Sequence, residues 1–408
     1  MNLLQFFHDN TVKLDKPEAL YIHIPFCTVR CAYCDFHSFA CKSVTDKSRS
    51  DYIDALFRQL DELEKLLGTF QFRTVYIGGG TPTSLEDVLF LRLLRTINER
   101  FGCFVQEWTV EANPETLSDS KLDMLRENGI TRISLGVQSL DEAELLSLGR
   151  KVRVEVVKSA LERSLNSGLR VSADLISGIP VHFHQGAVCK SALLSNVQYL
   201  INSKVHHISI YDLIVEQETR IEQQLTSGQL ILPDEDAMYE ERKAAEAILA
   251  HHGYSRYEIS NFARLHEEGI HNQVYWNMGS WIGLGSGAVS SLNVVGSGNS
   301  SCFSVRFEGN KNLEGFLTAS SFLAVKPELI NFIDAEIEMI MMGLRTKRGL
   351  DTKKFQSRFG IDPRVLIKNT LATWADFCIP DPGFIRLADR GMDLLNRILV
   401  DCMDEVRN

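Results

Sequence analysis

The stretch YIHIPFCTVRCAYCDFHSF, residues Tyr21–Phe39, decides how this sequence is interpreted. It places three cysteines, Cys27, Cys31 and Cys34, in a C-x3-C-x2-C spacing directly after a short apolar run. Thiolates this close together repel one another unless a metal or a cluster neutralises them. Three thiolates can bind three irons of a [4Fe–4S] cluster, which leaves the fourth iron open to a small ligand. The spacing therefore predicts an iron–sulfur site with an open coordination position.

A structural zinc site is the main alternative, because zinc requires four closed ligands. His23, His37 or Cys41 could supply the fourth. Zinc ribbons and fingers usually pair two short knuckles, however, and the chain contains no second C-x2-C. The aromatic side chains of Tyr33 and Phe36 also suit a cluster that needs shelter from solvent. The sequence therefore favours the cluster, with the remaining cysteines as reduced thiols.

The composition is that of an ordinary soluble protein. Of the 408 residues, 44% are hydrophobic and 24% are charged, and no run of about 18 apolar residues predicts a membrane span. The net charge of −10 argues against nonspecific binding to nucleic acid or to an anionic membrane surface. The first residues, MNLLQFFHDNTVKLD, lack the apolar core and cleavage pattern of a signal peptide. We therefore expect a cytoplasmic protein with no nucleic-acid partner and no integral membrane segment.

The first part of the chain alternates between short apolar runs and helical patterns. The apolar runs predict strands from Leu20 and over Thr74–Ile77, Trp108–Ala112, Ile133–Val137, Val171–Ile176 and His207–Leu213. Helical spacing predicts helices over Arg49–Leu67, Leu85–Phe101, Ser118–Asn128, Val154–Ser167, Lys190–Ile201 and Glu235–His251. Repeated β-α units imply parallel strands, either in a doubly wound sheet or in a complete or partial barrel. Periodicity leaves these α/β architectures open.

Polar residues recur at the ends of the predicted strands. Those at or just after the carboxyl ends are Cys27, Gly79, Glu111, Gln138, Asp174 and Asp212. This edge holds the active site in both parallel architectures. A functional site is therefore expected there.

The organisation changes after Gly253, where the β-α alternation stops. An aromatic, glycine-rich segment follows and contains HNQVYW, His271–Trp276. Beyond it the chain is mainly helical, and a helix pair before a short strand at Phe384–Leu387 resembles a winged-helix module. The expected divisions are a short N-terminal segment (1–19), an α/β barrel or sheet (20–260), a connection (261–312) and a C-terminal domain (313–408).

Several residues at the strand ends could bind a small molecule. Gly78–Gly80 is either a tight turn or a place where backbone amides face a ligand. Glu111, Gln138, Arg150 and Asp174 would singly be ordinary capping or surface residues. Together they supply an acid for an ammonium, an arginine for a carboxylate, and an amide and acid for ribose hydroxyls. An amino-acid-bearing nucleoside requires these groups.

His271, with Tyr275 and Trp276, is a candidate haem site. The imidazole would bind the haem iron and the aromatic rings would pack on the macrocycle. A lone histidine is more often a polar edge on an aromatic core. The Met-rich stretch around Met339 is more simply a core helix face.

The cysteine stretch followed by GGGTPT resembles the radical S-adenosylmethionine superfamily. The resemblance narrows to the oxygen-independent coproporphyrinogen III oxidase-like group over about residues 18–400. It is carried by YIHIPFC, GGGTPTSL, EANPE, RISLGVQS, LGR, DLISGIP, HISIYDL, YEISNFA, HNQVYW and RLADRGMDLL. The resemblance implies a partial (βα)6 radical S-adenosylmethionine barrel and a smaller, mainly helical, winged-helix-like C-terminal domain.

The same resemblance implies which residues bind the cofactors. The cluster ligands correspond to Cys27, Cys31 and Cys34. The S-adenosylmethionine contacts correspond to Tyr21, Tyr33, Gly79, Gly80, Thr81, Glu111, Gln138, Arg150 and Asp174. Two departures concern the substrate face: Val152 stands where the family often has histidine, and the family's GLPGQT turn is here GIPVHFHQG, residues 178–186.

Two branches of the group differ in features that this sequence displays. The porphyrinogen dehydrogenases carry a longer N-terminal segment and a further cysteine where this chain has Phe36. Phe36, the short N-terminal segment and HNQVYW resemble the HemW branch. That resemblance implies a haem chaperone that delivers haem to haem-requiring proteins, such as respiratory cytochromes, and that meets an electron donor. The alternative is radical oxidative decarboxylation of coproporphyrinogen III, so enzymatic activity is left open.

Overall fold

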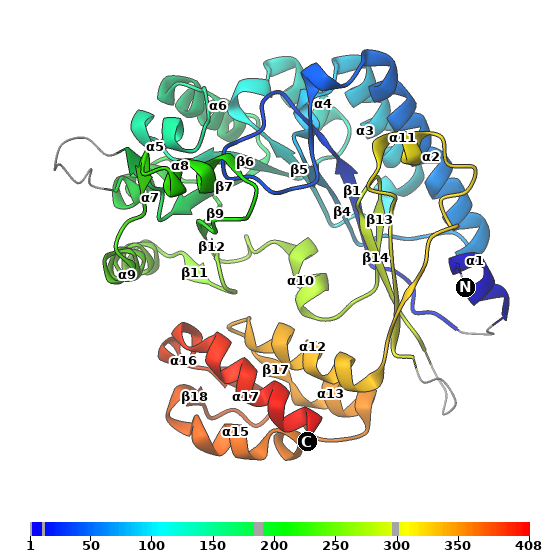
Figure 1. Cartoon of the computed structure of the whole chain (residues 1–408), viewed down its shortest axis with the longest axis vertical. Helices are drawn as coiled ribbons and strands as arrows, with labels where there is room; N and C mark the ends of the chain where they lie inside the picture. Colours follow the sequence, from blue (N-terminus) through cyan, green and yellow to red (C-terminus); the bar gives the residue numbers. More distant parts are fainter. Residues whose placement is uncertain (1, 10–12, 183–190, 296–301) are drawn as a thin grey trace.

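In the computed structural model, which describes residues 2–9, 13–182, 191–295 and 302–408, one large sheet organises the chain (Figure 1). Within those residues twelve strands pair in the order β11-β12-β9-β7-β6-β5-β4-β1-β13-β14-β15-β16. Their bounds are β1 (Ala19–Ile24), β4 (Thr74–Gly79), β5 (Glu107–Ala112), β6 (Arg132–Gln138), β7 (Arg170–Ser177), β9 (His207–Asp212), β11 (Ser255–Arg256), β12 (Asn261–Ala263), β13 (Trp281–Leu284), β14 (Val289–Asn293), β15 (Ser304–Glu308) and β16 (Glu328–Ile330).

The six strands predicted from the sequence are present, and each is parallel to its neighbours in the order β9-β7-β6-β5-β4-β1. The predicted helices follow them as α2 (Asp46–Leu67), α3 (Asp87–Phe101), α4 (Asp119–Glu127), α6 (Val154–Asn166), α7 (Leu193–Asn202) and α9 (Glu235–His251). Lys190, the predicted start of α7, lies outside the described residues. Parallel strands need such crossover helices. The prediction of a partial (βα)6 barrel is confirmed.

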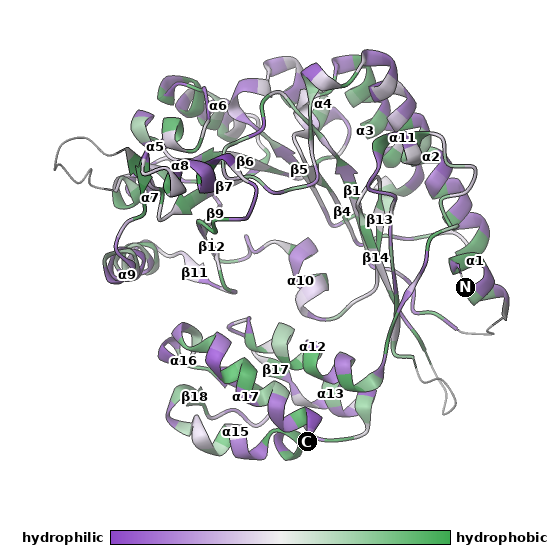
Figure 2. Cartoon of the chain, viewed as in Figure 1, coloured by the Kyte–Doolittle hydropathy of each residue, from purple (hydrophilic) through white to green (hydrophobic). Residues whose placement is uncertain are grey.

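Burial explains why these runs form strands and helices. Every residue of β6 from Arg132 to Val137 is buried, as expected for a strand covered on both faces. The surrounding helices are amphipathic, and Figure 2 shows hydrophilic and hydrophobic residues alternating along them. Thr45 caps α2 by accepting from the Ser48 amide at 3.1 Å.

The segment 261–312, expected as a connection, contributes β12 to β15 to the large sheet. Strand β13 pairs parallel to β1, and β14, β15 and β16 extend the sheet as antiparallel strands. A Cβ at Gly283 would lie 2.3 Å from the Val289 carbonyl oxygen, so this glycine permits the close β13–β14 approach. Short strands paired with sequence-distant partners have weak local signals, which is why periodicity missed them.

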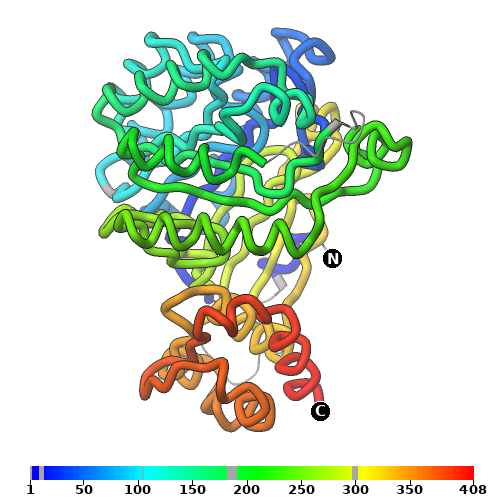
Figure 3. The backbone as a smooth tube through the Cα atoms, turned by 90° about the vertical axis from the view of Figure 1, so that its left-hand side faces the viewer, coloured from blue at the N-terminus to red at the C-terminus, as the bar shows by residue number. Residues whose placement is uncertain are grey.

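The C-terminal domain is a separate lobe on the side of the sheet away from α3 and α4 (Figures 1 and 3). Its helices are α12 (Phe332–Leu344), α13 (Thr352–Phe359), α14 (Pro363–Leu366), α15 (Lys368–Thr373), α16 (Asp389–Asp393) and α17 (Leu395–Arg407). Its three-stranded sheet has the order β17 (Leu350–Asp351), β19 (Phe384–Leu387), β18 (Cys378–Ile379). A helix, a strand, further helices and a hairpin follow in the order of a winged helix. Met339, Phe355 and Leu399 belong to its own apolar core.

Further elements had no signal in the sequence pattern. They are α1 (Leu3–Asp9), α5 (Glu142–Ser147), α8 (Arg220–Thr226), α10 (Ile270–Trp276), α11 (Leu313–Leu317), β2 (Phe26–Cys27), β3 (Phe39–Ala40), β8 (Val181–His182) and β10 (Leu230–Ile231). The motif HNQVYW thus forms α10, which lies between the sheet and the C-terminal domain (Figure 1). No helix among the described residues is long and apolar enough to span a bilayer.

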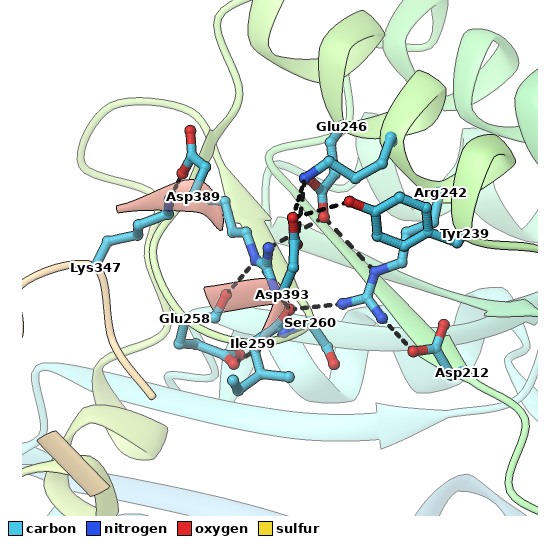
Figure 4. Close-up of polar contacts among 12 residues, drawn as sticks. Asp212, Tyr239, Arg242, Glu246, Glu258, Ile259, Ser260, Lys347, Asp389 and Asp393 are labelled. Atoms are coloured by element: carbon cyan, nitrogen blue, oxygen red, sulfur yellow. Dashed lines mark hydrogen bonds and ion pairs between the residues drawn. The ribbon is translucent and has the colours of Figure 1, made fainter. Parts of the chain in front are cut away.

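An ion-pair network joins the C-terminal domain to the barrel (Figure 4). Asp393 on α16 accepts from Tyr239 at 3.1 Å and from Lys243 at 3.3 Å, both on α9. On the same helix, Glu246 pairs with Lys243 at 2.9 Å and with Arg256 at 3.1 Å. The network therefore ties the lobe to the outer edge of the sheet.

Candidate functional site

The cysteine loop connects β1 to α2 and is held in place by backbone contacts. Strand β2, which ends in Cys27, pairs parallel with β3. The Ala32 amide donates to the Leu148 carbonyl at 2.8 Å, and the Ile221 amide donates to the Ala32 carbonyl at 2.9 Å. The loop is therefore held between the end of α5 and the start of α8 before any cofactor binds.

The three thiols of this loop occupy a low-polarity environment. Cys27 is buried, and Cys31 and Cys34 are half-buried. Burial raises the pKa of all three, that of Cys34 to about 11, and the charge of Cys31 raises the pKa of Cys27 and Cys34 further. Thr81 Oγ1 donates to Cys27 Sγ at 3.7 Å. Deprotonated thiols here require a strong positive partner, which the irons of a cluster supply.

The arrangement of these thiols is compatible with a cubane. In the described part of the chain, no three His, Cys, Asp or Glu side chains converge enough to hold one metal ion. A [4Fe–4S] cluster does not need such convergence, because each thiolate binds a different iron. The donor set therefore fits the group that the spacing predicts.

The glycines that end β4 permit a close approach to the cysteine loop. A Cβ at Gly80 would lie 2.8 Å from the Phe26 carbonyl oxygen, and one at Gly79, whose φ is 109°, would lie 2.2 Å from the His23 ring. The amides of Gly79 and Gly80 donate to Glu111 and to the Ile24 carbonyl, each at 2.9 Å. Both amides therefore have protein acceptors, and the role of Gly79 and Gly80 as S-adenosylmethionine contacts stays a prediction.

Two acidic side chains, Glu111 and Asp174, have buried carboxyl groups and no ion pair within the described part of the chain. Glu111 accepts from Tyr76 Oη at 2.8 Å and from the Gly79 amide. Burial raises the pKa of Glu111 to about 7, and the charge of Asp174 contributes. Burial also raises the pKa of Asp174, which accepts from Ser134 Oγ at 2.9 Å. Carboxylates held this way favour a cationic ligand.

Arg150 and Gln138 lie on the neighbouring part of the same edge. The Arg150 guanidinium is buried and donates to the Gly136 carbonyl at 3.0 Å and to Asn113 Oδ1 and Glu115 Oε2 at 3.2 Å. Gln138 has a φ of 63°, at a register shift in β6. Non-glycine residues with positive φ are strained and cluster at functional sites. Sequence reasoning missed Asn113 and Glu115, although both lie in EANPE.

The remaining predicted S-adenosylmethionine contacts lie around the same region. Tyr21 Oη is 2.9 Å from His23 Nδ1, and the Tyr21 and Tyr76 ring centroids are 6.2 Å apart. Tyr33 packs against the apolar cluster of Leu148, Ile176 and Ile179. The structure thus brings the predicted residues to the carboxyl end of the barrel around the cysteine loop.

Three expectations about the strand ends and the substrate face differ in detail from the structure. Asp174 lies within β7, three residues before its end. Asp212 ends β9 but pairs with Arg242 on α9, in the network of Figure 4. Val152 is a buried core residue, and residues 183–186 of the 178–186 turn lie outside the described residues.

The haem candidates lie at the opposite end of the barrel. His271 Nδ1 is 2.9 Å from Thr74 Oγ1, at the first residue of β4, and Nε2 is 2.7 Å from Tyr275 Oη. The His271 amide donates to Glu107, the first residue of β5, at 3.0 Å. Burial lowers the pKa of His271 to about 3. His271 therefore fastens α10 to the amino ends of the strands, and both ring nitrogens have partners.

Trp276 lies on the far side of α10, against the C-terminal domain. It lines a cavity of about 350 Å³ that also includes Tyr257, Met339 and Phe384. The indole Nε1 is buried and has no hydrogen-bond partner among the described residues. The structure separates the cysteine loop from α10 by the length of the barrel. The two groups of predicted residues therefore form two sites.

Comparison with known families and structures identifies the scaffold. The radical SAM superfamily model matches residues 21–185, and the HemN C-terminal domain model matches residues 334–394. The fold resembles coproporphyrinogen III oxidase (HemN) from Escherichia coli, a radical SAM enzyme, with a TM-score of 0.76 and 20% identity. That match covers 95% of this chain and 90% of the other.

Relatives at higher identity carry a different name. The haem chaperone HemW of Lactococcus lactis is 32% identical over 392 residues, covering 94% of this chain and 97% of that protein. The haem chaperone HemW of Haemophilus influenzae is 30% identical over 391 residues, covering 94% of this chain and 97% of that protein. The haem chaperone HemW of Escherichia coli is 34% identical over 279 residues, covering 68% of this chain and 70% of that protein. The chain belongs to the HemW haem chaperone family within the radical SAM superfamily.

Proposed function

We propose that this protein binds haem and transfers it to haem-requiring proteins, and that a [4Fe–4S] cluster on Cys27, Cys31 and Cys34 binds S-adenosylmethionine. The observation that carries the proposal is that the cysteine loop contacts the carboxyl end of β4, where Thr81 donates to Phe26, whereas α10 contacts Thr74, the first residue of β4. The two ligands would therefore lie at different ends of the barrel. The names of the relatives support haem as the second ligand.

At the carboxyl end of the barrel, the residues present suit an amino-acid-bearing nucleoside. The three thiolates would hold the cluster, which when bound supplies an open iron and a single electron. Glu111 and Asp174 would balance the positive charge of S-adenosylmethionine. Arg150 would share its guanidinium between Glu115 and the ligand carboxylate. Tyr33 adds an apolar wall.

At the amino end, α10 would contact haem through Trp276, with Tyr275 and His271 behind it. Ligation of iron by His271 requires the imidazole to exchange its contact with Tyr275 or with Thr74 for a metal bond. Haem binding through this residue would therefore displace α10 from the barrel. Such a coupling between haem binding and the position of α10 suits a carrier. Loss of haem would restore the contacts of His271 with Tyr275 and Thr74.

The acceptor and the electron donor follow from the same proposal. A haem carrier needs an acceptor lacking haem, and respiratory cytochromes are the expected class. Use of the cluster needs an external one-electron donor. We place these encounters in the cytoplasm.

The test is a side-by-side assay of anaerobically purified, cluster-loaded protein. We expect stoichiometric haem binding, seen as a Soret band, transfer of haem to an apo-cytochrome, and no conversion of coproporphyrinogen III. Conversion of coproporphyrinogen without haem binding would favour the alternative, an oxygen-independent coproporphyrinogen III dehydrogenase. The Cys27→Ala variant is the control, because it should lose the cluster and still bind haem.

A further inference from the structure

The cavity between α10 and the C-terminal domain has an amphipathic lining. Trp276 comes from α10, Met339 from α12, and Phe384 from β19. Its volume of about 350 Å³ is at the lower end of the range for small-molecule sites. It therefore suits one edge of a large flat ligand, with the rest of that ligand outside.

The charged side chains that line this cavity are mostly cationic. They are Arg256, Lys347, Arg348 and Lys354, against the acids Glu268 and Asp351. Burial lowers the pKa of Lys347 and Lys354, and neighbouring arginines lower both further. This local surplus of positive charge occurs in a chain with a net charge of −10. A pocket whose lining carries more cations than acids favours an anionic ligand.

Two of the four cations already have acidic partners. Arg256 pairs with Glu246 at 3.1 Å, and Lys347 pairs with Asp389 on α16. Arg256 and Glu246 both belong to the barrel, whereas Lys347 and Asp389 both belong to the C-terminal lobe (Figure 4). Arg256 and Lys347 are therefore already paired with acids of their own domains.

The other two cations are available. In the described part of the chain, no carboxylate lies within ion-pair distance of Arg348 or Lys354. The Lys354 ammonium donates to the Asn277 carbonyl at 2.7 Å, directly after α10. The Arg348 guanidinium lies 5.2 Å from the centroid of the Phe384 ring. Arg348 and Lys354 can therefore each bind a carboxylate without breaking an existing ion pair.

We infer that Arg348 and Lys354 bind the carboxylates of a tetrapyrrole whose ring edge enters this cavity beside Trp276. The aromatic and thioether lining matches the ring, the two free cations match two propionates, and the buried indole N–H matches a carboxylate oxygen. This inference rests on the proposed haem function and adds the place and the charged contacts. A tetrapyrrole bound in this way would keep one ring edge in solvent, where an acceptor protein can reach it.

The test compares haem with its dimethyl ester on the cluster-loaded full chain. For wild-type protein we expect the ester, which has no carboxylates, to bind about tenfold or more weakly than haem. The double variant Arg348→Ala/Lys354→Ala should weaken haem binding by a similar factor and leave ester binding unchanged. Lys353→Ala is the matched control, since Lys353 is an exposed neighbour on the same helix.

Each outcome decides the inference. Equal binding of haem and ester by wild-type protein, or unchanged haem affinity in the double variant, would overturn it while leaving haem binding intact. No haem binding by wild-type protein would instead remove the proposed function itself. Inorganic phosphate, ATP and free porphyrin are also compared as competitors of haem. If phosphate or ATP displaced haem at a lower concentration than porphyrin, the pocket would be assigned to a nucleotide and the inference overturned. The ester comparison needs no variant, so a folding defect in the double variant leaves the test valid.

Discussion

The ring of Tyr76 lies 5.1 Å from the imidazole of His271, and this contact links the two ends of the barrel. On one side the Tyr76 hydroxyl donates to Glu111, in the region proposed to bind S-adenosylmethionine. On the other side His271 belongs to α10, which borders the proposed haem pocket. One strand residue thus contacts groups from both sites.

Tyr76→Phe should weaken S-adenosylmethionine binding and leave haem binding unchanged. The phenylalanine keeps the ring beside His271 but removes the hydrogen bond that lowers the pKa of Glu111. A hydrogen bond to a charged group contributes about 1.5–3 kcal/mol, so the pKa of Glu111 should rise by about one unit or more. Equilibrium binding of both ligands at neutral pH measures this. A parallel loss of haem affinity would show that the ring contact, rather than the hydroxyl, was disturbed.

S-adenosylmethionine affinity should depend on pH through Glu111. The pKa of Glu111 is raised to about 7, and a cationic ligand binds the ionised carboxylate. Affinity should therefore be constant above that pH and fall about tenfold per unit below it. Binding titrations with cluster-loaded protein between about pH 5 and 8 check this, because that range spans the pKa of Glu111, about 7. Glu111→Gln should bind more weakly with no such slope; a slope retained in this variant would assign the titration to another group.

The cluster should depend on three cysteines and not on a fourth. Cys27→Ala, Cys31→Ala and Cys34→Ala should each abolish the cluster, because each thiolate binds one iron. Cys41→Ala is the matched control, since its thiol lies 3.9 Å from Ser84 Oγ. Iron and sulfide analysis under anaerobic conditions should find about four irons per chain in wild-type and Cys41→Ala protein. Stoichiometric zinc without sulfide would contradict the cluster.

His271→Ala and Thr74→Val separate a structural role of the imidazole from iron ligation. His271→Ala removes a buried ring with two contacts and should destabilise the fold by about 2–4 kcal/mol. Thr74→Val removes one of the same contacts and retains the imidazole. If His271 ligates iron, the Soret band should shift only in His271→Ala. Identical spectra for both variants would make His271 a positioning residue of α10.

Much of the barrel was predictable because its signals are local. The strands β4, β5, β6, β7 and β9 are short apolar runs, and amphipathic helices with caps such as Thr45 separate them. Parallel topology then brings their carboxyl ends to one edge. The sequence predicted correctly that Gly78–Gly80 lie at the end of a strand. The acceptor of the Gly79 amide could not be predicted, since Glu111 is 32 residues away.

The second site could not be placed from sequence. HNQVYW indicated that His271 and Tyr275 belong together, and on a helix they are one turn apart and in contact. Nothing local showed that α10 lies against the amino ends of the strands, because that position depends on Thr74 and Glu107. No local pattern indicated that Arg348 and Lys354 line one pocket with Trp276.

The sequence by itself determined the β-α repeat and the family and predicted the cluster ligands, because these depend on spacing along the chain. The tertiary structure alone decided that the cysteine loop and α10 lie at opposite ends of one barrel. It also decided that two cations of the interdomain pocket are without acidic partners among the described residues, whereas two are paired. The physical reason is that such contacts join residues far apart in sequence, as Thr74 and His271 are 197 positions apart, and local residue patterns do not encode which distant segments meet.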